Sequence, residues 1–115
     1  MQSASYRARL MEYLARLASD HHEYRDKAFL LGLLSQAPIP QADLFKYLLL
    51  PADIQLALQK RSGFLGSLLT LTETLETGKH HHVGILTHQL GIRRDEIMRG
   101  IVESLGWSNA LAHAE

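Results

Sequence analysis

Residues 28–35 read Ala-Phe-Leu-Leu-Gly-Leu-Leu-Ser, an apolar run at helical spacing that one small residue, Gly32, interrupts. A run this rich in leucine has to be buried against other helices, and it is far shorter than the roughly 20 residues of a membrane-spanning helix. The glycine forms a notch at which a neighbouring helix can approach closely. We therefore expect Gly32→Leu to destabilise the fold by over-packing. Helix packing is the first constraint on this chain.

The composition is that of one folded domain, which we place at residues 1–115. Twelve basic residues balance 12 acidic ones, so the chain has no overall field that would attract nucleic acid or an anionic membrane. Cysteine is absent, which excludes disulfides, thiolate catalysis and cysteine-ligated zinc. The first residues lack the charged start and apolar core of a signal peptide, and we expect a cytoplasmic protein without membrane attachment.

Helical periodicity recurs along the whole chain, and no segment alternates with the period of a strand. The predicted fold is all-α, an irregular bundle of about seven short helices. Their approximate ranges are 3–18, 21–36, 40–49, 51–60, 62–78, 82–90 and a last helix from residue 95 through residue 107. Because the loops between them are short, we expect successive helices to pack as neighbours.

Capping residues mark several of the helix ends. Asp20 and Glu23 have the spacing of a capping box at the start of the second helix. Pro51 suits the first turn of the fourth helix. Gly78 and Gly91 are expected to end the fifth and sixth helices in the left-handed conformation, with an apolar residue behind the second of them.

No group of side chains has the spacing of a catalytic or metal site. His80, His81 and His82 are adjacent, so on a helix they point about 100° apart and cannot share one metal ion. The order Asp20-His21 reverses the His-Asp dipeptide of HD phosphohydrolases. Glu73 and Glu76 lack a third acidic partner and are expected to be solvated surface groups. We therefore predict that the chain is not an enzyme, with no catalytic residue, no cofactor and no metal.

The turn Ser62-Gly63-Phe64-Leu65-Gly66-Ser67 precedes a helix, where free amides can bind an anion. It lacks the spacing and the lysine of a phosphate-binding loop. We expect its two glycines to permit close helix packing instead.

Residues 82–106 have the pattern of a helix-turn-helix, because one helix ends in Leu90-Gly91-Ile92 and the next begins with polar residues. Arg93, Arg94 and Arg99 would then lie near the DNA groove. The acidic residues beside them would repel phosphates, and the chain has no excess of positive charge. DNA binding is therefore the alternative function, not the first.

The same three arginines, with Trp107, are our candidate interface residues. Trp107 lies on the last predicted helix, where it is either a buried anchor or an exposed aromatic contact to a partner.

Taken in order, the motifs resemble the C-terminal part of bacterial HDOD modules, particularly those of EAL–HDOD proteins in cyclic di-GMP signalling. The resemblance covers about residues 24–112. Its motifs are the helix 28–35, Leu50-Pro51-Ala52-Asp53-Ile54, Gly63-Phe64-Leu65-Gly66-Ser67-Leu68-Leu69, Glu76-Thr77-Gly78, Leu90-Gly91-Ile92 and Trp107.

This resemblance implies an HD-like helical fold without metal ligands and a regulatory role in signal transduction. It implies a protein partner, of which an EAL-type domain is the expected kind. The chain holds only the later portion of such a module and has no EAL motif, so the resemblance implies no hydrolysis of cyclic di-GMP by these residues. An incomplete apolar face further predicts self-association into a homo-oligomer.

Overall fold

The computed structural model describes residues 3–78 and 80–114, with side chains described at 5–78 and 83–106. Seven helices and no strand lie within these residues, which confirms the predicted all-α fold. The helices are α1 (Ser3–Ala18), α2 (His22–Ser35), α3 (Gln41–Tyr47), α4 (Ala52–Lys60), α5 (Gly63–Thr77), α6 (His80–Leu90) and α7 (Arg94–Ala114).

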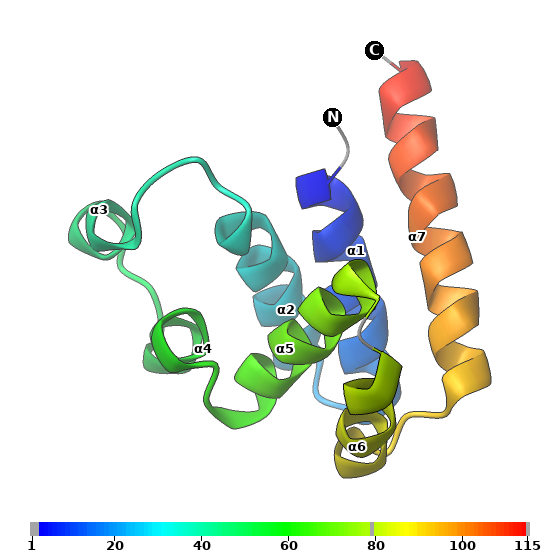
Figure 1. Ribbon diagram of the computed structural model, residues 1–115. Coiled ribbons are helices and arrows are strands. Elements are labelled where there is room, and N and C mark those ends of the chain that lie inside the picture. The colour runs from blue at the N-terminus through cyan, green and yellow to red at the C-terminus, as the bar shows by residue number, and fades with distance from the viewer. Residues whose placement is uncertain (1–2, 79, 115) are drawn as a thin grey trace.

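Helix α1 lies at the centre of the arrangement, with α2 along one side of it and α7 along the other (Figure 1). Helix α5 crosses α1 and α2, and α3 lies at the edge of the molecule far from α7 (Figure 1). The prediction that each helix packs on the next one is wrong for α7, which packs chiefly on α1 and not on α6, and for α2, which does not pack on α3 to any appreciable extent. The loop before α7 turns the chain back, so the last helix covers the first.

The core forms around α1 because its apolar residues recur every three or four positions and so share one side of the helix. Leu10, Met11 and Leu14 are fully buried there. The other helices contribute a second set of fully or almost fully buried side chains, which are Ala28, Leu31, Ile54, Leu65, Leu68, Leu69 and Leu71. One contiguous core therefore spans α1, α2, α4 and α5, and it also includes Val83 of α6 and Ile97 of α7.

At the notch of Gly32, α1 and α2 approach closely. A Cβ atom on Gly32 would lie 2.5 Å from Cα and 2.8 Å from the backbone nitrogen of Ala8. Close packing is likewise confirmed at Gly66, whose Cβ would lie 2.2 Å from the carbonyl carbon of Arg61 in the α4–α5 turn. It is wrong for Gly63, where a Cβ would meet nothing within 4 Å and the φ of +75° is what requires glycine.

Both predicted left-handed helix ends are confirmed, with φ of 74° at Gly78 and 71° at Gly91. At the second end, the amide of Gly91 donates to the carbonyl of His88 and the amide of Ile92 donates to that of Thr87. These two bonds form a Schellman motif, and its apolar residue, Ile92, is buried.

Several predicted helix starts and ends are wrong. His21, not Asp20, is the N-cap of α2, and no side-chain capping bond forms there, so the capping box is absent. Asp20 stands one residue too far from the free amides to accept from them. Pro51 is the N-cap of α4 and not in its first turn. Helix α3 ends at Tyr47, two residues earlier than predicted, and α6 begins at His80, two residues earlier.

Candidate interaction surfaces

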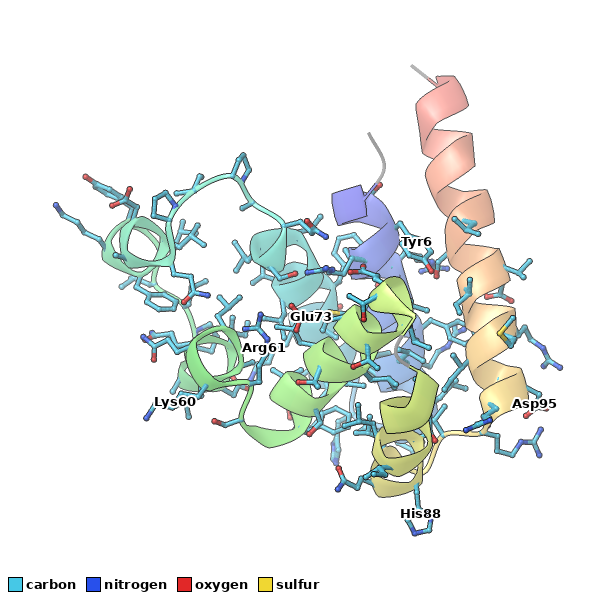
Figure 2. The ribbon with its side chains drawn as sticks, viewed as in Figure 1. Tyr6, Lys60, Arg61, Glu73, His88 and Asp95 are labelled. Carbon is cyan, nitrogen blue, oxygen red and sulfur yellow. The ribbon has the colours of Figure 1, made fainter. Side chains whose placement is uncertain are left out.

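The histidines that could suggest a metal site are His88 and the adjacent His80, His81 and His82. His88 is exposed and points away from the other helices (Figure 2). The side chains of His80, His81 and His82 lie outside the described ones. Among the residues that the structure describes, no three His, Asp or Glu side chains are grouped as metal ligands.

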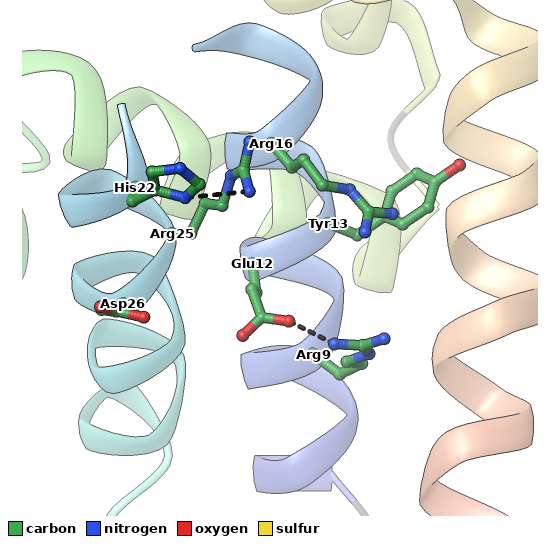
Figure 3. A pocket seen from close by; sticks show the side chains of 7 residues that line it. All are labelled: Arg9, Glu12, Tyr13, Arg16, His22, Arg25 and Asp26. Carbon is green, nitrogen blue, oxygen red and sulfur yellow. Dashed lines mark hydrogen bonds and ion pairs between the residues drawn. The ribbon is translucent and has the colours of Figure 1, made fainter. Parts of the chain in front are cut away.

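A polar pocket of about 320 Å³ lies between α1 and the start of α2 (Figure 3). Its lining comprises Arg9, Glu12, Tyr13, Arg16, His22, Arg25 and Asp26. Arg9 pairs with Glu12, Arg16 lies 5.0 Å from the Tyr13 ring centroid, and Arg25 contacts Nδ1 of His22. The Nε atom of Arg25 is buried without a hydrogen-bond partner among the described residues. This pocket brings no activated nucleophile to a general base, and we assign it no reaction.

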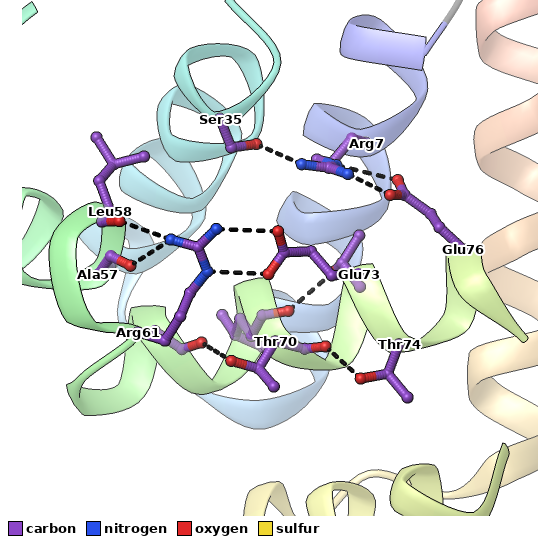
Figure 4. Close-up of polar contacts among 12 residues, drawn as sticks. Arg7, Ser35, Ala57, Leu58, Arg61, Thr70, Glu73, Thr74 and Glu76 are labelled. Atoms are coloured by element: carbon purple, nitrogen blue, oxygen red, sulfur yellow. Dashed lines mark hydrogen bonds and ion pairs between the residues drawn. The ribbon is translucent and has the colours of Figure 1, made fainter. Parts of the chain in front are cut away.

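Glu73 and Glu76, which we expected to be solvated, both bind arginines (Figure 4). Glu76 pairs with the buried guanidinium of Arg7, which also donates to Ser35 Oγ at 3.0 Å. Glu73 receives two bonds from Arg61, at 2.9 and 3.0 Å. Arg61 additionally donates to two carbonyls at the end of α4. These carboxylates hold helices together, since each one joins α5 to another part of the fold.

The dependence of stability on pH tests the surroundings of Tyr6. Burial raises the pKa of the Tyr6 hydroxyl above its usual value, and the nearby carboxylate of Glu76 raises it further. The folded state then holds the phenol proton more tightly than the unfolded chain does. That stability is present below pH 10, about the unfolded pKa, and is lost as the pH rises through the higher folded pKa. The urea concentration at the unfolding midpoint should therefore fall more between pH 8 and pH 11 in the wild type than in Tyr6→Phe. An identical fall in both proteins would contradict the raised pKa of Tyr6.

Helix α7 contacts α1 through one face only. Ile97 is buried on this face, and Gly100 lies against the Tyr13 ring, where a Cβ would be 2.5 Å from Cδ1. Ser104 continues the face one turn later and is fully buried. Glycine is a weak helix former, but at Gly100 the missing side chain lets α7 approach α1.

The neighbouring face of α7 is apolar and exposed. Met98, Val102 and Leu105 recur at i, i+4 and i+7 and are 60%, 66% and 45% exposed. We call these three residues the α7 stripe. Three large apolar side chains on one helix face are typical of a surface that binds another protein.

A groove of about 380 Å³ runs beside the α7 stripe, between α7 and the ends of α5 and α6. Its lining is apolar apart from one arginine and consists of Leu75, Val83, Arg94, Ile97, Met98 and Ile101. Met98 belongs to both the groove and the stripe, so the two form a continuous surface.

A second exposed apolar region surrounds α3 on the far side of the molecule (Figure 1). The helical spacing of Leu44 and Leu48 predicts that both point inward, but Leu48 is exposed. Ile39 and Tyr47 are exposed as well, and Leu49 is fully exposed. We call these four residues the α3 segment. Helix α3 packs only lightly, against α4, and it buries Leu44.

The three candidate arginines are exposed: Arg93 directly precedes α7, and Arg94 and Arg99 lie in its N-terminal half. Arg93 binds the carboxylates of Asp95 and Glu96, at 2.9 and 3.5 Å, and its hydrogen bond lowers the pKa of Asp95. Arg94 lines the groove, and Arg99 lies beside the stripe. The side chain of Trp107 is outside the described ones. Met98, Val102 and Leu105 were missed as a surface, although the excess of apolar residues on α7 was the signal for it.

The chain is similar to one curated protein of known name. It is 33% identical over 91 residues to the cyclic di-GMP phosphodiesterase CdgJ of Vibrio cholerae. The similarity covers 74% of this chain but only 21% of that relative. No family model and no solved structure matches the chain. The chain is thus homologous to about a fifth of a protein whose name connects it with cyclic di-GMP. No described helix is long and apolar enough to cross a membrane.

Proposed function

We propose that this chain is a non-catalytic regulatory module of bacterial cyclic di-GMP signalling, of the HDOD type, which acts in the cytoplasm by binding another protein. The similarity to a phosphodiesterase supports the signalling context. The binding role rests on one observation, the exposure of the α3 segment at the two ends of a helix that little else covers. The expected partner is an EAL-type phosphodiesterase domain.

The exposed side chains of the α3 segment suit such a role. Tyr47 and Leu49 offer an aromatic ring and an aliphatic side chain to a partner, and aromatic anchors contribute strongly to interfaces. The only ring contact described for Tyr47 is with its own neighbour, the ammonium group of Lys46, at 5.4 Å. Burying these side chains against a partner would remove apolar area from water without disturbing the core.

Two measurements test the proposal. The purified chain, supplied with Mg²⁺ or Mn²⁺, should leave cyclic di-GMP intact. Biolayer interferometry should detect binding to an EAL-type domain, and Leu49→Glu should weaken it by about tenfold or more, since a charge would enter an apolar contact. Gln59→Glu, an exposed polar position on α4, is the control and should bind as the wild type does.

Turnover of cyclic di-GMP by the chain alone would overturn the non-catalytic assignment. Binding that Leu49→Glu does not weaken would overturn the assignment of the α3 segment. Steeply salt-dependent binding to duplex DNA would favour the helix-turn-helix alternative instead.

A further inference from the structure

We propose that the α7 stripe is the interface of a two-fold symmetric dimer, in which α7 packs antiparallel against α7 of a second copy of this chain. The inference rests on α7 alone and is independent of the proposed function, which concerns the α3 segment.

The first argument is the pattern of the stripe. Met98 and Leu105 lie at its ends and Val102 lies near its middle, so reversing the helix superimposes the stripe approximately on itself. A two-fold interface brings the same patch of both copies together and therefore requires such self-complementarity. In an antiparallel pair centred between residues 101 and 102, Met98 meets Leu105 of the other copy.

The second argument is charge. Arg99 and Glu103 flank the stripe on the same side, and both are exposed. Neither makes an ion pair within the part of the chain that the structure describes. The antiparallel register places Arg99 of one copy beside Glu103 of the other, twice per dimer. In a parallel pair this flank of the two copies would lie on opposite edges of the seam, so Arg99 and Glu103 could not pair between copies.

The third argument is the groove. It opens on the other side of the stripe, next to Met98, and its walls include Ile97 and Ile101. In the antiparallel pair Leu105 of the second copy lies at its mouth. The dimer thus covers the exposed stripe and narrows an apolar groove that a monomer leaves open to water. The balanced charge of the chain adds no long-range repulsion between copies.

Light scattering after size-exclusion chromatography, from 1 to 100 μM, should show a mass approaching twice the 12.9 kDa of the chain. Val102→Glu should raise the dissociation constant by about 30-fold or more, because it buries two charges at the symmetry axis. The residue is exposed in the monomer, so circular dichroism should show an unchanged fold. Leu49→Glu, in the α3 segment, is the matched control and should dimerise normally.

Charge-reversed variants test whether Arg99 pairs with Glu103 of the other copy or with Glu103 of its own helix. Arg99→Glu and Glu103→Arg should each dimerise more weakly than the wild type, whereas an equimolar mixture of the two should form heterodimers. A mixture of Lys60→Glu and Asp20→Arg carries the same net charges at exposed sites elsewhere and should not gain dimer.

A wild type that stays monomeric at 100 μM would overturn the inference. So would a dimer that Val102→Glu leaves intact, or one that Leu49→Glu abolishes. A mixture of the charge-reversed variants without more dimer than either alone would overturn the antiparallel register. If the wild type dimerises through α7 but does not bind an EAL-type domain, only the proposed function is refuted.

Discussion

Gly32→Ala is expected to destabilise this protein by about 3 kcal/mol, although alanine is the better helix former. The new methyl group would meet two backbone atoms of Ala8, at 2.5 and 2.8 Å, and a backbone cannot rotate away as a side chain can. Helices α1 and α2 would have to separate by roughly an ångström, which loosens the contacts around the fully buried Leu31. Gly32→Leu should lose more stability than Gly32→Ala, because a larger side chain needs a larger separation of the two helices.

Gly106→Ala is the matched control for this prediction. It is also a helical glycine, but a Cβ there would meet nothing within 4 Å. The protein should gain up to about 1 kcal/mol from helix propensity. Urea denaturation followed by circular dichroism, at one protein concentration, measures both changes. If the two alanine variants gain stability alike, the close approach at Gly32 is wrong.

The sequence allowed the fold class and most helix ranges to be predicted, because those features depend on local patterns. Apolar residues three and four apart define each helix, and a glycine at Gly78 or Gly91 ends it whatever the distant contacts are. The notch at Gly32 was predicted for the same reason, since a small residue inside an apolar run has few other uses.

What failed depends on distant parts of the chain. Arg7 and Glu76 are 69 residues apart, so no local pattern connects them; Glu76 lies at the surface as predicted, but its pairing with Arg7 was missed. The α7 stripe was missed for a different reason. Periodicity showed that Met98, Val102 and Leu105 are helical and apolar, but only the packing of α7 on α1 decides which of its apolar faces is covered. Which of the candidate arginines are exposed also depends on how α7 packs on α1.

Glu76→Gln is expected to destabilise the fold by about 3 kcal/mol, because it removes the counter-charge of Arg7, whose side chain is only 9% exposed. Arg7 would keep its bond to Ser35 but would face an amide where a carboxylate had been. The double variant Arg7→Met, Glu76→Leu should recover much of the loss, since no charge then remains buried.

Glu73→Gln is the control: its partner Arg61 is well exposed and retains its carbonyl contacts, so the loss should stay below about 1 kcal/mol. Thermal and urea denaturation of the four proteins measure these differences. Equal losses in Glu76→Gln and Glu73→Gln would show that burial of Arg7 adds nothing to this ion pair, and the account of how α1 is held to α5 would then be wrong.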